Sequence, residues 1–158
     1  MLDRALEASK EAEYHVSEPY DELQAVDDEV TSNPSDYLRR RLKKFEEYFG
    51  IVTHEDFRVP FELLSPEEVA VAQRVFVEAS WNAVKHAQAR NLWLETRRVG
   101  SVVIVRVRDD GRGFEAAEPP PGLGLRYMRR RAEEVGAELD VISAPGPSTT
   151  IQLRFDNR

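Results

Sequence analysis

Apolar residues recur at helical spacing in three segments of this chain and alternate with polar residues in five others. The helical segments are 36–49, 66–89 and 125–136. The strand-like segments are 51–59 (one strand or two short extended pieces), 91–98, 101–110, 137–143 and 149–155. Because the strands cluster rather than alternate strictly with helices, this order predicts an α+β fold. We expect a two-layer α/β sandwich, with a mixed sheet of about five strands covered on one face by about three helices.

Signals for helix ends support these boundaries. Ser65 and Glu68 have the spacing of a capping box, and the proline between them at 66 suits the first helical position. Asp36 is the expected N-cap of the first predicted helix, and Gly50 follows its end. The cluster TSNPSD at 31–36 is rich in helix breakers and marks a boundary.

The apolar stripe of the longest predicted helix stops halfway along it. Val71 and Val75 lie on the stripe, but the next positions on the same face are polar: Glu78, Asn82, Lys85 and His86. Burying such groups without partners costs about 1–3 kcal/mol each when they are neutral, and more when they are charged. The helix alone favours a face that turns into solvent, where cations near the C-terminus also suit the helix dipole.

Two glycine motifs follow in the sequence. The strand 101–110 ends in Asp109-x-Gly111-x-Gly113, and Gly122-x-Gly124 precedes the helix that starts at Leu125. Glycines after a strand let the backbone approach a ligand closely, and a glycine loop before a helix presents unpaired N–H groups to phosphate. Each motif is weak alone, since an Asp-Asp-Gly tract is more often a turn. Neither matches a Walker A loop or a dinucleotide-binding fingerprint.

In combination and in this order, the three motifs resemble the ATP-binding domain of sensor histidine kinases. Its fold, the Bergerat ATP-binding fold, is shared with gyrase, MutL and the heat-shock chaperone ATPases. The stretches NAVKHA, DDGRGF and GLGLRYMRRRAEEVGAELDVISAPGPSTTIQLRF bring the chain nearest to the nitrate-sensor (NarX-like) type. The resemblance covers roughly 36–155. It divides the chain into an acidic linker or helical remnant at 1–35 and a catalytic domain at 36–158.

The resemblance implies roles for the polar face of the long helix. Asn82 would coordinate Mg²⁺, and Glu78 would position or deprotonate a water molecule or the attacking group. Lys85 and His86 would contact the phosphates. For His86, a structural role as a helix cap or packed side chain is an equal alternative. An amide oxygen is a suitable ligand for Mg²⁺, which binds mainly through water and substrate phosphates.

The resemblance also implies that both glycine motifs contact ATP. Asp109 would accept a hydrogen bond from the adenine amino group. The remaining cofactor-binding positions are Gly111 and Gly113 near the base, and Gly122, Gly124 and Leu125 near the triphosphate. The stretch 114–121 would form a short lid. We expect the arginines of the last helix to face solvent as readily as phosphate, and Trp81 and Trp93 to belong to the core.

The composition limits the classes of partner and the cellular location that we expect for this chain. A net charge of −7 argues against binding nucleic acid by general phosphate attraction, and the chain has no cysteine and no stretch long enough to span a membrane. We therefore expect a cytoplasmic chain, which would be linked to a membrane only through a sensor region outside it. No segment matches the phosphoacceptor helix of these kinases, since neither His15 nor His54 lies in such a motif.

The predicted function is that of the Mg-ATP-binding catalytic domain of a two-component sensor histidine kinase. It would supply the γ-phosphoryl group to a histidine on dimerisation and phosphoacceptor helices, with a response regulator downstream. A serine/threonine kinase of the anti-sigma-factor type is the alternative of the same fold, because such kinases need no phosphoacceptor helices. A nucleotide-binding module without enzymatic activity is a third possibility.

Overall fold

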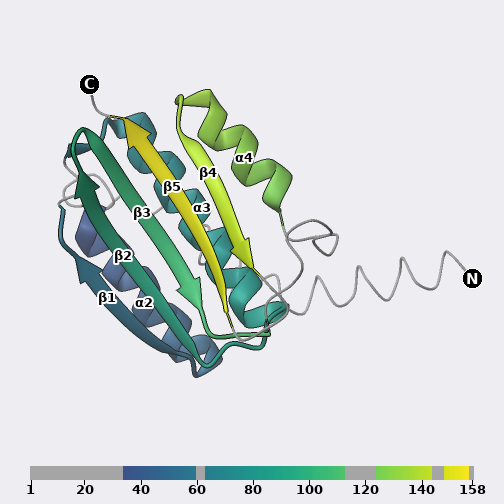
Figure 1. Ribbon diagram of the computed structural model, residues 1–158. Helices are drawn as coiled ribbons and strands as arrows, with labels where there is room; N and C mark the ends of the chain where they lie inside the picture. The colour runs from purple at the N-terminus through teal and green to yellow at the C-terminus, as the bar shows by residue number, and fades with distance from the viewer. Residues whose placement is uncertain (1–33, 60–62, 113–123, 144–147, 157–158) are drawn as a thin grey trace, which may run out of the picture.

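A computed structural model describes residues 34–59, 63–112, 124–143 and 148–156. The elements within these ranges, labelled in Figure 1, are α2 (Pro34–Phe49), β1 (Val52–Phe57), α3 (Pro66–Lys85), β2 (Asn91–Val99), β3 (Val102–Asp109), α4 (Leu125–Glu134), β4 (Glu138–Ser143) and β5 (Thr149–Asp156). Among the described residues, no helix is long and apolar enough to cross a membrane.

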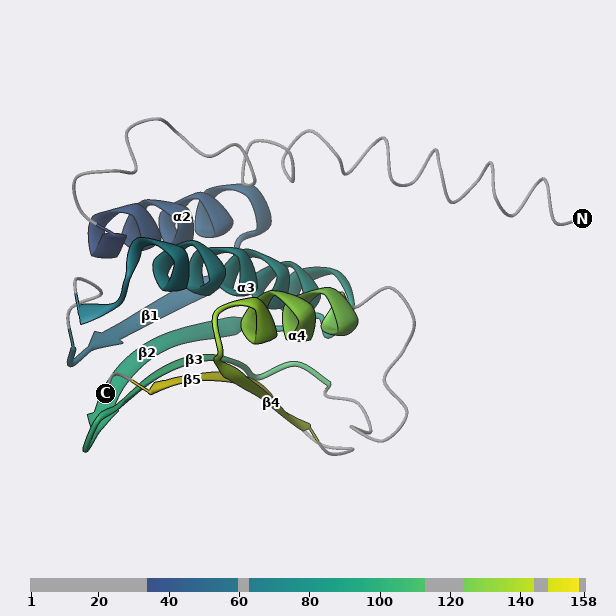
Figure 2. The same cartoon turned by 90° about the horizontal axis from the view of Figure 1, so that it is seen from above.

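The strands form one mixed sheet in the order β1-β2-β3-β5-β4, in which β1 runs parallel to β2 and the other neighbours are antiparallel. Figure 2 shows α2, α3 and α4 together on one face of the sheet, with α3 between the other two. This is the predicted two-layer α+β sandwich with five strands and three helices. The parallel pair follows from α3, which carries the chain back across the sheet between β1 and β2.

Alternation along the strands places the core between the sheet and the helices. The inward side chains of the central strands are buried: Leu92, Leu94, Val103, Val105, Val107, Ile151, Leu153 and Phe155. Trp81 is buried as expected, but the expectation for Trp93 is wrong. Because Leu92 and Leu94 point inward, Trp93 lies half-buried on the outer face, with the His54 ring centroid 5.0 Å from its own and the Arg108 guanidinium 4.2 Å from it.

The predicted capping box is present at the start of α3. The Ser65 hydroxyl accepts a hydrogen bond from Glu68 N at 3.1 Å, and the Glu68 carboxylate accepts one from Ser65 N at 2.9 Å. Two other boundaries differ from expectation. The first helix begins at Pro34 rather than after Asp36, and α3 ends at Lys85 rather than near 89.

The early end of α3 has a local cause. Both His86 N and Ala87 N donate to the Asn82 carbonyl oxygen, at 2.9 and 3.1 Å, so the regular ladder stops there. Ala89 N then reaches back to the Ala83 carbonyl oxygen, and Gln88 has a φ of 52°. A positive φ at a residue other than glycine ends the helix geometry. The spacing of apolar residues carries no trace of this turn.

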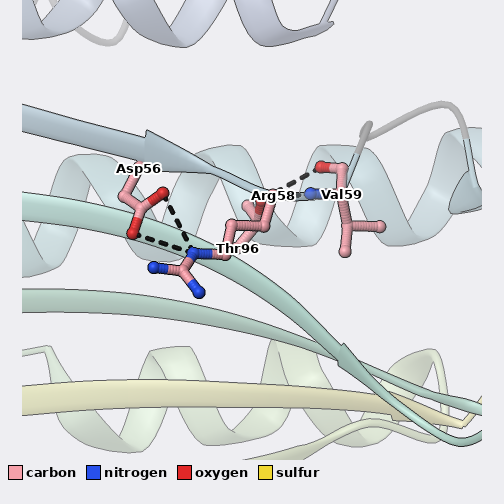
Figure 3. A network of polar contacts seen from close by, with 4 residues as sticks. All are labelled: Asp56, Arg58, Val59 and Thr96. Atoms are coloured by element: carbon pink, nitrogen blue, oxygen red, sulfur yellow. Dashed lines mark hydrogen bonds and ion pairs between the residues drawn. The ribbon is translucent and has the colours of Figure 1, made fainter.

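A buried hydroxyl fixes the chain where it leaves β1 toward α3 (Figure 3). Thr96 on β2 is 1% exposed; its Oγ1 donates to the Val59 carbonyl oxygen at 3.0 Å and accepts from Val59 N at 3.2 Å. Arg58 N donates to the Thr96 carbonyl oxygen at 3.2 Å. One side chain thus satisfies both backbone groups of Val59, which would otherwise be buried unpaired.

Candidate functional site

The polar face of α3 lies where the sequence places it. Glu78, Asn82 and His86 are half-buried and Lys85 is exposed, with its ammonium 5.8 Å from the centroid of the Trp81 ring. His86 is the C-cap residue of the helix. Burial lowers the pKa of the His86 imidazole, and the charge of Lys85 lowers it further, so this side chain is neutral at pH 7. The solvent-facing alternative therefore fits Lys85 but not Glu78 or Asn82.

The second glycine motif meets this face at Glu78. Gly124 has a φ of +68° and is the N-cap residue of α4, without a side-chain capping bond. A Cβ at Gly124 would lie 3.0 Å from Oε2 of Glu78. The backbone at the start of α4 therefore passes directly against the Glu78 carboxylate, at the end of the helix where its N–H groups and dipole favour an anion.

The first glycine motif packs on the residues that follow α3. A Cβ at Gly111 would lie 2.4 Å from the Ala87 Cβ and 2.6 Å from the Ala87 carbonyl oxygen, so only glycine fits there. Arg112 N donates to that same carbonyl oxygen at 3.0 Å. The Arg112 guanidinium also contacts the His86 carbonyl oxygen, at 3.4 Å. The loop after β3 is therefore held against the end of α3.

Asp109 is a buried carboxylate at the end of β3. The alternation of β3 points it to the same face as Val107, toward the helices, and it is 6% exposed. Gly111 N donates to its Oδ1 at 2.8 Å. Burial raises the pKa of the Asp109 carboxyl to about 6, with the Gly111 hydrogen bond opposing and the charge of Asp110 adding to the rise. Buried Thr149 on β5 is its register partner.

Asp110, the next residue, has a different environment. Its Oδ1 accepts from Arg90 N at 2.9 Å and from Asn91 N at 2.8 Å, and its Oδ2 accepts from Asn91 Nδ2 at 2.8 Å. Burial pushes the pKa of Asp110 upward, but the hydrogen bonds from the Asn91 side chain and backbone outweigh it, so the net shift is downward. The sequence motifs assign no role to Asp110 or Asn91, and only the Asp-Asp doublet at 109–110 draws attention to Asp110.

The donor set fits a magnesium ion held with a nucleotide rather than one held by protein alone. Among the described residues, no group of three or more His, Asp or Glu side chains could hold a metal ion. Asn82 offers a single amide oxygen, one helical turn from Glu78 on the same face of α3. Mg²⁺ commonly binds through one or two protein ligands, several waters and substrate phosphates, so one amide is sufficient when phosphates are present.

Some predicted site positions lie outside the described residues. These are Gly113, Gly122 and the expected lid at 114–121. Leu125 is described and buried at the first position of α4, where it packs in the core. The arginines Arg126, Arg129 and Arg130 are exposed. The structure thus brings together Glu78 with Gly124, and Ala87 with Gly111, around the second half of α3.

Comparison with known proteins identifies this arrangement. The family described as histidine kinase-, DNA gyrase B- and HSP90-like ATPase matches residues 68–158, more than half of the chain. The chain belongs to this ATPase family. The match covers α3 from Glu68 onward, Gly111, Gly124 and the closing strands, so it includes every element that forms the candidate site.

Solved structures of histidine kinases share the fold. The histidine kinase domain of the blue-light-activated kinase from Erythrobacter litoralis EL346 is 23% identical over 79% of this chain and 61% of its own, with a TM-score of 0.62. AdeS from Acinetobacter baumannii is 14% identical over 99% of this chain and 84% of its own, with a TM-score of 0.62. The catalytic domain of the histidine kinase ThkA is 16% identical over 79% of this chain and 93% of its own, with a TM-score of 0.63. The chain spans less than two thirds of the EL346 histidine kinase domain and 43% of the longer EL346 kinase.

Proposed function

We propose that this chain is the Mg-ATP-binding catalytic domain of a sensor histidine kinase, and that it delivers the γ-phosphoryl group to a histidine on separate phosphoacceptor helices. The observation that carries the proposal is the convergence of three motifs on one helix. The Gly124 backbone lies against Glu78, and the Gly111 loop lies against Ala87, just beyond Asn82 and His86. These three motifs, in this order, carry the resemblance to the ATP-binding domain of sensor histidine kinases.

Different residues of the site contact the adenine base and the phosphates of the nucleotide. Asp109, fixed by Gly111 N at Oδ1, presents Oδ2 to the adenine amino group in the domain's interior. Gly111 keeps the loop close enough to α3 for the base to fit beside it. At the other end, the N-terminus of α4 after Gly124 faces the phosphates. Exposed Lys85 adds a mobile positive charge, and neutral His86 donates or accepts a hydrogen bond.

Magnesium would be held by Asn82 together with the phosphates, and it would neutralise charge that develops on the transferred group. Glu78 lies one turn from Asn82 and beside Gly124, where it orients the attacking group toward the γ-phosphate. Phosphoryl transfer needs mainly positioning and charge stabilisation, so these few groups suffice.

Isothermal titration of the chain with ATP tests binding. We expect affinity in the micromolar range or better with Mg²⁺, clearly weaker affinity with EDTA, and loss of that difference in Asn82→Ala. Gln152→Ala, which removes an amide on the outer face of β5 where its Oε1 accepts from Arg106 Nε, is the matched control and keeps the Mg²⁺ dependence. If no binding is detectable below millimolar ATP, the proposal is wrong.

Labelled ATP then tests transfer. We expect acid-labile phosphate on an added dimerisation and phosphoacceptor domain, and none on the isolated chain. Transfer to serine of an anti-anti-sigma protein instead would replace the histidine kinase with the alternative kinase of the same fold. Binding of Mg-ATP without transfer to either acceptor would favour a nucleotide-binding module.

A further inference from the structure

We infer that Asp110 and Asn91 are positioning residues that set the orientation of the adenine-recognising carboxylate, Asp109. This inference rests on the proposed contact between Asp109 and adenine. It assigns a function to two side chains that lie beside the site and do not touch the nucleotide. Both come from the strand ends that meet there, the start of β2 and the end of β3.

The geometry is a clamp across two strands. The register pairs Leu92 with Asp109, so the regular β2–β3 ladder ends at the residue that must face the base. Beyond this point the Asp110 carboxylate accepts three hydrogen bonds from Asn91, the first residue of β2, and from Arg90 just before it, each 2.8 or 2.9 Å long. Asp110 N donates to the Asn91 carbonyl oxygen at 3.3 Å. Side-chain hydrogen bonds therefore extend the ladder past its last backbone pair.

This extension matters because Asp109 immediately precedes a glycine loop. Asp109 has one described hydrogen bond, from Gly111 N, and it is buried away from solvent. A carboxylate in that position keeps a fixed direction only if the backbone on both sides is fixed. β3 fixes the preceding side, and the bonds of Asp110 to Arg90 and Asn91 fix the following side. Charge-assisted bonds to backbone N–H groups are well suited to this task.

A third residue orients the Asn91 amide. His54 Nε2 lies 3.0 Å from Asn91 Oδ1, while Asn91 Nδ2 donates to Asp110 Oδ2. With the amide oxygen engaged by His54, the NH₂ group is directed to Asp110. The row His54, Asn91 and Asp110 thus links β1, β2 and the end of β3 on the outer side of the sheet, while Asp109 points to the inner side.

The test is discrimination between ATP and purine riboside triphosphate, which lacks only the 6-amino group of ATP. In the unaltered chain we expect ATP to bind about tenfold to a hundredfold more tightly, the range for a hydrogen bond to a charged group. In Asp110→Ala this ratio falls to within about threefold of unity, while affinity for purine riboside triphosphate changes little. Asn91→Ala reduces the ratio less, and Asp110→Asn, which keeps one acceptor oxygen, is intermediate.

Asp156→Ala is the matched control. Asp156 lies at the end of β5 and accepts a hydrogen bond from Ser101 Oγ at 2.8 Å, at the opposite end of β3. We expect it to keep full discrimination. If folded Asp110→Ala or, should that variant not fold, folded Asn91→Ala discriminates as well as the unaltered chain, the inference is wrong. If the unaltered chain itself does not discriminate, the proposed contact of Asp109 fails first, and this inference fails with it.

Discussion

Buried polar groups near the two ends of α3 differ in how fully protein partners satisfy them. At its N-terminal end, Ser65 and Glu68 exchange hydrogen bonds, and in the segment leading there the Thr96 hydroxyl satisfies both backbone groups of Val59. At the other end, Asp109 is buried beside a glycine loop without a paired cation among the described residues. At the N-terminal end, protein groups satisfy the hydrogen bonds of these polar groups without a ligand. The other end carries a cost that binding a ligand would offset.

Asp109→Asn should give the largest effect, and it should lower ATP affinity while it raises the stability of the free chain. With Gly111 N on Oδ1, the new NH₂ group faces the adenine amino group, donor against donor, so ATP affinity falls by about tenfold or more. Without ATP, the variant should be more stable at pH 7.5 by up to about 3 kcal/mol, because an uncharged side chain replaces one whose pKa is raised to about 6. Urea unfolding with and without ATP measures both.

The pH dependence of this gain has a definite direction. The folded pKa of Asp109 lies above the unfolded value, so its unfavourable contribution is absent at low pH and grows as the pH rises through about 6. The stability gain of Asp109→Asn should therefore be roughly half as large at pH 5 as at pH 7.5. A gain that is equal at both pH values, or a loss, would mean that the charge of Asp109 is not costly.

Gly111→Ala should have the next largest effect. The added methyl group meets Ala87, including its backbone oxygen, so the loop or the end of α3 must move. We expect a loss of about 2 kcal/mol in the free energy of unfolding together with weaker ATP binding. Gly100→Ala is the control: a Cβ there meets nothing within 4 Å, though its φ of +61° still disfavours alanine. It should lose stability without losing ATP affinity.

Thr96→Val should have the smallest of these effects and be confined to stability. The variant keeps the shape of the side chain but leaves Val59 N and its carbonyl oxygen without their partner, at a cost of about 1–2 kcal/mol. ATP affinity should stay within about twofold, because the altered contact lies away from the glycine motifs. A large loss of affinity in this variant would show that the two ends of α3 are coupled and that the contrast between them is false.

Much of the fold was predictable because its signals are local. The capping box, the alternation of β2 and β3, and the glycine after α4 each act within a few residues, and each formed as expected. The polar face of α3 was also readable, since Glu78 and Asn82 fall at helical spacing. The placement of the Gly111 loop against the end of α3 could not be predicted from local signals, because nothing local states that α3 and the end of β3 meet.

The parts that escaped prediction depend on contacts between distant segments. One of them is the packing of Gly111 against Ala87, which are 24 residues apart in the numbering. The clamp of Asp110 on Asn91 requires the register of β2 with β3, which alternation alone does not fix. Trp93 was misassigned because a large aromatic residue suits either face of a strand, and only its neighbours decide.

The two outermost strands of the sheet also limit how the domain can associate. β1 and β4 are the edge strands, and both carry charges: Glu55 and Asp56 on β1, Glu138 and Asp140 on β4. These acids form ion pairs with Arg39, Arg58 and Arg154, and an edge covered by charged groups resists extension of the sheet into a continuous ladder. Edges of this kind favour a domain that remains a separate unit even at high concentration.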